Sequence, residues 1–212
     1  MYLPPHFDER RPEMLQALVR CHPLGLLVTQ SADGTLAADP IPWLLDLEAD
    51  GSHTLRGHVA RANPVWQQAR RDTDALVVFQ GPQAYVSPSL YPSKAEHGKV
   101  VPTWNYIVLQ ARGRFEAIDD ADWKRALVTR LTERFEAPRA APWAVTDAPA
   151  DYVTTMLRAI VGIELRVHTL TGKWKTSQNR SAADRAGVRA GLRADAGAQA
   201  VAGPVGLPVP EA

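Results

Sequence analysis

The sequence is poor in several features, and each shortage excludes a class of protein. Only one of its 212 residues is a cysteine, so the chain cannot form an internal disulfide, which is typical of a reducing compartment. No apolar run approaches the ~20 residues of a membrane-spanning helix. The first residues lack the basic and apolar regions of a signal peptide. We therefore expect a cytoplasmic protein without a membrane partner.

An excess of charge of either sign is also missing. The chain has 24 Lys and Arg against 23 Asp and Glu, a net charge of +1, so no global basic field indicates nucleic-acid binding. We also find no recognisable DNA-binding motif. The best candidate for contact with a DNA backbone is the row Arg185, Arg189 and Arg193, which shares one face of an expected helix. A solvated helix face explains the same row, so DNA as a partner is left open.

Motifs for metal binding and catalysis are absent as well. The segment "TGKWKTS" lacks the glycine of a phosphate-binding loop at Val167 and its Ser or Thr at Trp174. His53 and His58 lie on opposite faces of one expected strand, and no HExxH or paired cysteines occur, so we expect no metal. No GxSxG motif is present, and the neighbouring side chains of Cys21 and His22 diverge. The sequence therefore identifies no catalytic residue.

What the chain does contain is alternation of strand and helix patterns. Short runs separated by Asp-Gly turns predict strands, and apolar residues at helical spacing predict helices. We expect strands at 24–30, 35–48, 53–60, 75–81, 104–118 and 162–170, and helices at 8–23, 63–71, 119–137, 152–160 and 181–194. These elements predict an α+β fold dominated by β: a closed or nearly closed antiparallel barrel with flanking helices. Residues 1–194 form one domain in this interpretation, and 195–212 a flexible tail rich in Ala, Gly and Pro.

For two of the expected strands, the sequence also predicts a position in the sheet or a buried face. Pro40 and Pro42 each lack a backbone N–H, so the strand over 35–48 should lie at an edge of the sheet or be bulged there. The strand over 104–118 alternates between apolar and polar residues, so we expect one of its faces to be buried.

Polar residues near the ends of strands are candidates for ligand binding. Arg61 and Asn63 follow the strand that holds His58 and precede a helix that begins at Pro64. Guanidinium donors and free helical N–H groups together suit an anion. A basic strand end, with Asn63 capping the helix, explains the same residues. The loop "YVSPSLYPSK" adds Ser87 and Ser89, although loops of this composition often have no further role.

Two further segments are candidates. In "VPTWNY", Trp104 lies on one strand face and Asn105 on the other, as either a half-buried aromatic or a platform for a planar ligand. In "GKWKTSQNRSAADRAGV", Lys175, Ser177 and Gln178 offer donors to an anionic ligand. The alternative is a solvated basic turn before a helix that is capped by Asn179 or Ser181.

Five segments together resemble one family. "MYLPPHF", "GHVARANP", "AYVSPSLY", "VPTWNY" and "KWKTSQNRSAADRAGV" occur in the order and spacing of the PaiB family. This family is described as FMN-binding negative transcriptional regulators, and its members are similar to flavin-binding split barrels of the pyridoxamine-phosphate oxidase type. The resemblance runs from Met1 to about Leu192. It implies an antiparallel split β-barrel with flanking helices, which works as a homodimer with FMN near the subunit interface.

The resemblance also assigns roles to the candidate residues. It implies that Arg61 binds the phosphate of FMN, with His58 and Asn63 nearby. Ser87 and Ser89 would lie beside the ribityl-phosphate chain or the ring edge, and Trp104 and Asn105 near the isoalloxazine. The segment with Lys175, Ser177 and Gln178 would close the site, either from the same chain or from the partner subunit.

Two classes of function are consistent with these residues and this resemblance. As a negative transcriptional regulator, the protein would bind DNA or a partner protein, and FMN would be a structural or redox-sensing group. As an FMN-dependent oxidoreductase of the flavin reductase or oxidase kind, it would act on an unknown small molecule through the redox chemistry of FMN.

Overall fold

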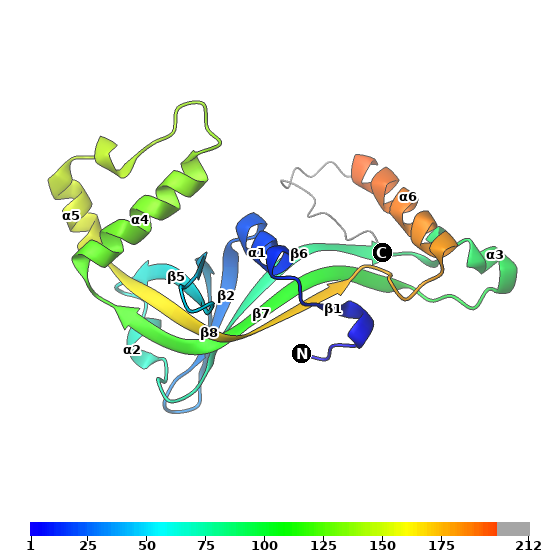
Figure 1. Ribbon diagram of the computed structural model, residues 1–212, viewed down its shortest axis with the longest axis horizontal. Coiled ribbons are helices and arrows are strands. Elements are labelled where there is room, and N and C mark those ends of the chain that lie inside the picture. The colour runs from blue at the N-terminus through cyan, green and yellow to red at the C-terminus, as the bar shows by residue number, and fades with distance from the viewer. Residues whose placement is uncertain (199–212) are drawn as a thin grey trace. The chain divides into compact units, whose positions relative to one another are not determined.

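A computed structural model describes the backbone of residues 1–198 and the side chains of residues 1–194. The strands are β1 (Asp8–Glu9), β2 (Leu24–Gln30), β3 (Leu36–Pro42), β4 (Leu44–Leu47), β5 (His53–Ala60), β6 (Ala75–Val86), β7 (Thr103–Ile118) and β8 (Ile160–Lys175). The helices are α1 (Pro12–Cys21), α2 (Val65–Gln68), α3 (Ser93–His97), α4 (Ala121–Glu136), α5 (Ala150–Arg158) and α6 (Ala182–Ala198), with 3₁₀ turns η1 (Pro5–Phe7), η2 (Pro88–Leu90) and η3 (Val145–Asp147) (Figure 1). The last helix therefore continues past the predicted end at residue 194, and the rest of the predicted tail, 199–212, lies outside the described residues.

The strands form one eight-stranded sheet with the order β3-β2-β6-β7-β8-β5-β4, and β1 pairs with β8. The pairs β1–β8, β2–β3, β2–β6, β4–β5 and β5–β8 are antiparallel. Within the described residues, no ladder joins the outer strands β3 and β4, so the sheet is open rather than closed. The predicted class is confirmed: a mostly antiparallel, split sheet with flanking helices.

Trp43 divides the strand that was predicted over 35–48 into two strands at opposite ends of the sheet order. Its backbone N–H donates to the Pro23 carbonyl at 2.9 Å, and its indole Nε1 donates to the Gly25 carbonyl at 3.3 Å. The indole is fully buried. A Cβ at Gly25 would lie 2.6 Å from Phe79, so this position has room only for glycine. Both halves are edge strands, as the prolines predict.

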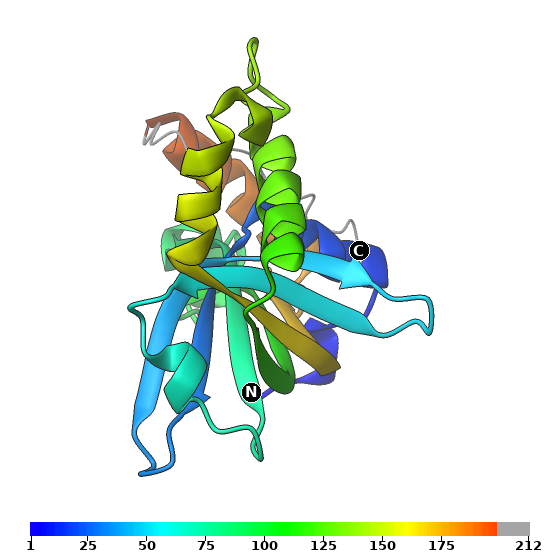
Figure 2. The same cartoon turned by 90° about the vertical axis from the view of Figure 1, so that its left-hand side faces the viewer.

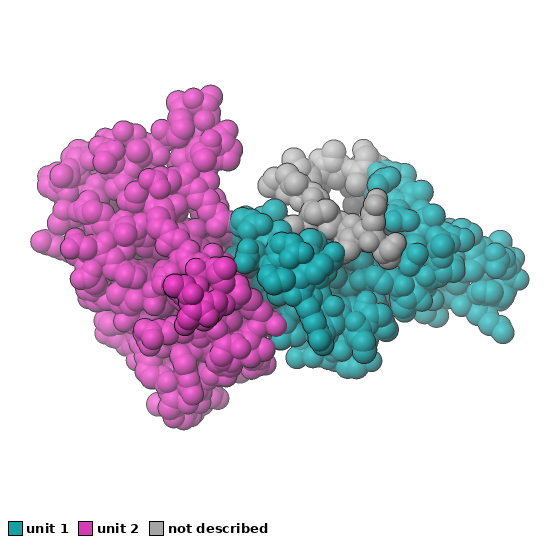
Figure 3. Space-filling model, viewed as in Figure 1, with its two compact units in different colours: residues 1–21, 80–109, 171–212 teal, residues 22–79, 110–170 magenta. Residues whose placement is uncertain are grey.

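The chain divides into two compact units (Figure 3). Unit 1 consists of residues 1–21, 80–109 and 171–212, and unit 2 of residues 22–79 and 110–170. The long strands β6, β7 and β8 each supply residues to both units.

In unit 2, helices α4 and α5 stand side by side (Figure 2). Asp120 caps α4, because its carboxylate accepts the Trp123 N–H at 2.7 Å. Leu127 and Leu131 then pack on Leu44 of β4. In α5, Val153 and Leu157 are buried, as predicted. Two other residues of its predicted apolar face are not: Tyr152 is 56% exposed and Met156 43%, since neighbouring elements cover only part of this short helix.

In unit 1, helix α1 buries Leu15 and Leu18 against the strands. Helix α6 packs through Val188 on a cluster that also contains Val86 and Tyr91. Ser181 caps α6 by accepting the Asp184 N–H at 3.1 Å, which is one of the two capping roles that the sequence predicted. Among the described residues, no helix is long and apolar enough to cross a membrane.

Candidate functional site

A pocket of about 500 Å³ lies in unit 2 between the β2–β3 hairpin and the start of α2. Asn63 is fixed in its wall: the amide Nδ2 donates to Asp39 at 2.7 Å, and Oδ1 accepts the Val65 N–H at 2.9 Å. Asn63 therefore binds the first N–H of α2, although the N-cap position itself is Pro64, and a ligand role would have to come in addition. The other polar residues of the wall are Thr29, Ser31, Thr35 and Gln68. Hydroxyl and amide groups both donate and accept hydrogen bonds, so this wall can bind the donors and the acceptors of a polar ligand.

Arg61 follows β5 in the same unit, and most of its donors are in use. Its Nη1 and Nη2 donate to Asp119 at 2.9 and 2.6 Å, and its Nε donates to the Arg158 carbonyl at 2.6 Å. Asp119 also accepts from the buried Lys124 at 2.7 Å. The hydrogen bonds from Arg61 and Lys124 hold the pKa of Asp119 far below its usual range. A phosphate at Arg61 would therefore share the guanidinium with Asp119 or displace this carboxylate.

His58 lies on β5 opposite Gly162 of β8. Its Nδ1 is buried and has no hydrogen-bond partner within the described residues. Burial lowers the pKa of His58, so the imidazole is neutral at pH 7. A buried polar atom without a partner costs free energy, which a bound ligand could recover. His22 and His53 of unit 2 also have a buried ring nitrogen without a partner among the described residues, but of the three histidines His58 lies nearest in the chain to Arg61 and Asn63.

In unit 1, Lys175 at the end of β8 reaches across to β7. Its ammonium donates to the Thr103 hydroxyl at 2.5 Å and to the Trp104 carbonyl. Burial lowers the pKa of Lys175, and the neighbouring Lys173 and Arg180 add to this effect. An anion at this position would favour the charged ammonium.

The turn after Lys175 is held in an unusual conformation. Ser177 has φ +70°, in the left-handed region that is uncommon for residues other than glycine, and its hydroxyl donates to Asn105 at 3.1 Å. The Gln178 amide accepts from the Thr176 N–H at 2.7 Å and donates to the Trp174 carbonyl. Both ends of that amide are thus occupied by the turn itself, which limits what Gln178 offers to a ligand. Strain of this kind is often kept at binding sites.

The remaining predicted residues also lie in unit 1. Ser87 accepts the Ser89 N–H at 3.2 Å, and the two hydroxyls lie 2.8 Å apart at the start of η2. Trp104 is 53% exposed and meets Tyr85 edge to face, with 6.0 Å between ring centroids. A groove of about 290 Å³ runs along this aromatic surface, and its wall includes Gln80, Gln83, Trp104 and Tyr106.

The ten predicted residues thus fall into two groups. His58, Arg61 and Asn63 belong to unit 2, and the other seven belong to unit 1. The structure brings together Lys175 with Trp104, Ser177 with Asn105, and Ser87 with Ser89. Sequence reasoning missed Asp39 and Asp119, whose partners lie 24 and 58 positions away in the chain. No local pattern marks either carboxylate.

The open antiparallel sheet identifies the chain as a split-barrel protein. The polar groups of its pockets are suited to binding a small molecule. Residues 1–169 match the family model described as "Putative FMN-binding domain". The chain is 30% identical to the protease synthase and sporulation protein PAI 2 of Bacillus subtilis, over 87% of this chain and 85% of that protein. The chain therefore belongs to the PaiB family of FMN-binding proteins, and FMN is the cofactor of this family.

Two further proteins are similar to this chain, one in sequence and one in fold. An uncharacterised protein of Emericella nidulans is 35% identical over 89% of this chain and 88% of its own length. A solved FAD- and haem-binding protein of Mycobacterium smegmatis has the same fold, with a TM-score of 0.58 and 21% identity, over 84% of this chain and 78% of that one.

Proposed function

We propose that the chain is an FMN-binding negative transcriptional regulator that works as a homodimer in the cytoplasm. The observation that carries the flavin part is the buried Nδ1 of His58, which has no partner among the described residues. It lies on the strand that leads to Arg61 and Asn63. FMN combines a polar ring edge, hydroxyls and a phosphate, and the donors of both units suit these groups.

We propose that two copies complete the site. In this proposal, Arg61 and Asn63 hold the phosphate end, with His58 nearby, and Ser87 and Ser89 lie along the flavin. Trp104 and Asn105 lie near the ring. The segment with Lys175, Ser177 and Gln178 closes the site from the same chain or from the partner. A twofold dimer is the commonest assembly that can do this.

An exposed apolar sheet face in unit 2 supports the dimer. Leu26 of β2 pairs with Pro40 of β3 and with Val78 of β6, and Val28 pairs with Ala38 and Leu76 in the same register. Since side chains of directly paired residues share one face of a sheet, these residues form a continuous apolar surface. Leu26 is 39% exposed in the single chain. A second copy would remove this surface from water.

The flavin proposal is tested by titrating the apoprotein with FMN and with riboflavin. We expect tighter binding of FMN, because only FMN carries the phosphate. Arg61→Ala should weaken FMN binding by about 1.5–3 kcal/mol, the range for a hydrogen bond to a charged group. It should leave riboflavin binding nearly unchanged. Equal affinity of the wild type for both flavins would contradict the phosphate site.

Support for regulation comes from the PAI 2 relative, whose name associates it with protease synthesis and sporulation. The test is a gel shift with FMN-loaded protein at physiological salt. Specific DNA must bind clearly more tightly than random DNA, for which dissociation constants near 10⁻⁴–10⁻⁶ M are usual.

One observation favours an FMN-dependent oxidoreductase instead. The groove beside Trp104 and Tyr106 would accept a planar molecule, with Gln80 and Gln83 as polar contacts. Rapid mixing of the FMN-loaded protein with NADH or NADPH distinguishes the two functions. Reduction of the flavin and turnover with an acceptor, without specific DNA binding, would favour the enzyme.

A further inference from the structure

The charges of this nearly neutral chain are segregated between its units. Unit 1 contains eleven Lys and Arg against seven Asp and Glu, a net charge of +4, and unit 2 contains thirteen against sixteen, a net charge of −3. Within the segments 80–109 and 171–194 of unit 1, eight cations accompany only two carboxylates, Glu96 and Asp184. The overall charge of +1 conceals this local field.

Six of these cations make up what we call the basic face. They come from α3, α6 and the residues beside these helices: Lys94, Lys99, Arg180, Arg185, Arg189 and Arg193. Among the described residues, none of these side chains has a hydrogen bond or an ion pair. Arg180 stacks on Tyr91, 5.1 Å from the ring centroid, and its charge helps to lower the pKa of Asp184. In unit 2, by contrast, Arg56, Arg61 and Arg130 are all bound to carboxylates.

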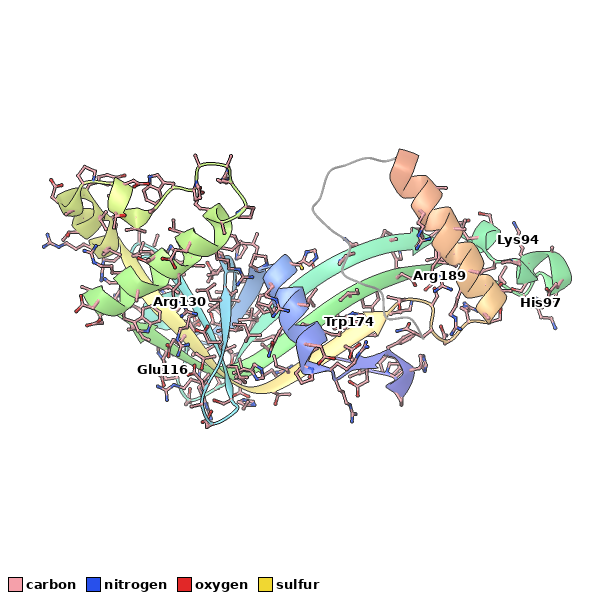
Figure 4. The ribbon with its side chains drawn as sticks, turned by 45° about the horizontal axis from the view of Figure 1, so that its top comes forward. Lys94, His97, Glu116, Arg130, Trp174 and Arg189 are labelled. Atoms are coloured by element: carbon pink, nitrogen blue, oxygen red, sulfur yellow. The ribbon has the colours of Figure 1, made fainter. Side chains whose placement is uncertain are left out.

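The basic face is built on a rigid base. The Asp184 carboxylate of α6 accepts from the Ser93 N–H at 3.1 Å and from the Ser93 hydroxyl at 2.9 Å, which ties α6 to the start of α3. A Cβ at Gly187 would lie 2.3 Å from the Leu90 carbonyl, so α6 lies directly on η2. Figure 4 shows Arg189 on α6 and Lys94 and His97 on the adjacent α3. The helix that carries three of the arginines is therefore tied to α3 and η2.

The arrangement on α6 suits a regular polyanion. Arg185, Arg189 and Arg193 follow one another at about 6 Å along the helix, given a rise of 1.5 Å per residue. Guanidinium groups bind phosphates through paired hydrogen bonds. Of the residues between them, Val188 and Leu192 pack into the core of unit 1, and the others are small: Ala186, Gly187, Ala190 and Gly191. This composition offers no apolar side chain for insertion into a membrane and no amide that could read bases.

We propose that the basic face binds the phosphate backbone of duplex DNA. This inference rests on the proposed regulatory function and names the surface that carries it out. The face supplies affinity and salt dependence but no sequence discrimination, because it contacts phosphates only.

The test uses full-length, FMN-loaded protein and a fluorescent duplex of random sequence, followed by anisotropy over a range of salt concentrations. The variant carries Arg185→Gln, Arg189→Gln and Arg193→Gln. We expect its affinity for the duplex to fall by about tenfold or more, and the slope of log K against log salt to become shallower by about 2–3. The matched control carries Arg112→Gln, Arg125→Gln and Arg139→Gln, three exposed arginines of unit 2. It loses the same charge and should bind DNA nearly as well as the wild type.

The outcomes separate this inference from the proposed function. If the wild type binds DNA and the α6 variant binds it equally well, the basic face is not the DNA-binding surface. The proposed regulatory function would be unaffected by this result. An equal loss of DNA affinity in the variant and in the control would also contradict the proposal for the basic face, because the total charge of the protein would then explain the binding. No binding of the wild type to any duplex would overturn both proposals. Tighter binding to phosphatidylserine vesicles than to DNA would assign the face to membranes. Unchanged FMN affinity shows that each variant is folded.

Discussion

Arg61 and Asp119 are joined by two parallel hydrogen bonds, from Nη1 to Oδ2 at 2.9 Å and from Nη2 to Oδ1 at 2.6 Å. Their side chains are 38% and 48% exposed, so water screens the pair and it contributes little to stability. A phosphate dianion could therefore replace the carboxylate without a large loss. Asp119 is in this respect a competitor for the proposed ligand.

Replacement of this carboxylate tests the competition. Asp119→Asn removes the negative charge and frees Arg61, so FMN should bind about three- to tenfold more tightly, a change of about 1 kcal/mol. Riboflavin affinity should stay the same, since riboflavin has no phosphate. Asp122→Asn, in the first turn of α4, is the matched control. Flavin titration followed by fluorescence measures all of these, and weaker FMN binding by the Asp119 variant would contradict the idea.

Acid should weaken unit 2 through Asp46. Burial opposes ionisation of this carboxyl, but hydrogen bonds from Arg130 and Arg56 outweigh it, and the pKa of Asp46 is lowered. A lowered pKa in the folded state gives stability that is present above the unfolded value near 3.8 and is lost as the pH falls further.

Urea unfolding between pH 6 and pH 2 measures this effect. The wild type should lose at most about 1.4 kcal/mol per pH unit through this one proton. Asp46→Asn should be less stable at pH 6 and show a shallower decline in acid. Parallel curves for the two proteins would mean that Asp46 does not contribute to the acid sensitivity.

The close contact between Gly25 and Trp43 predicts a strong effect of one methyl group. Gly25→Ala would place a Cβ 2.9 Å from the indole of Trp43 and should destabilise the protein by about 1–3 kcal/mol. Trp43→Phe removes part of the ring and should reduce the additional cost of the alanine. Thermal unfolding of both single variants and the double variant tests this. Strictly additive effects would show that the two residues do not interact.

A charge on the apolar sheet face should separate the proposed dimer. Leu26→Asp places a carboxylate among Pro40, Val78 and their neighbours, so light scattering should give a mass near the 23.2 kDa of one chain, against twice this value for the wild type. Leu47→Asp, at a leucine of β4 that is 61% exposed, is the control and should stay dimeric. A monomeric wild type with FMN bound would disprove the assembly.

The sequence predicted the features that depend on local periodicity. The alternation of Ile107, Leu109 and Phe115 predicted the buried face of β7, and all three are buried. Apolar residues at helical spacing predicted a helix over 119–137, and α4 occupies most of this range. The prolines of β3 predicted an edge strand. These signals arise within a few residues, so a single sequence contains them.

Features that depend on distant partners were not predictable in this way. Trp43 ends one strand because Gly25, eighteen positions earlier, leaves room for its indole. The end of β8 was missed because Lys173 and Trp174 are both buried and hide the alternation. The carboxylates that hold Arg61 and Asn63 come from other parts of the chain, so the sequence suggested two free ligands where the structure has two engaged side chains.

The continuity of β8 has a consequence for how the protein is made. Leu55 pairs with Leu165, 110 positions further along the chain, and Asp8 pairs with Lys173. Strand β5 therefore leaves the ribosome long before β8, its pairing partner, has been translated. The interval is longer still for β1, which also pairs with β8. Such non-local pairing slows folding. A nascent chain that stops before β8 would expose unpaired strand edges, so we expect truncated products to need a chaperone rather than to accumulate as a stable half.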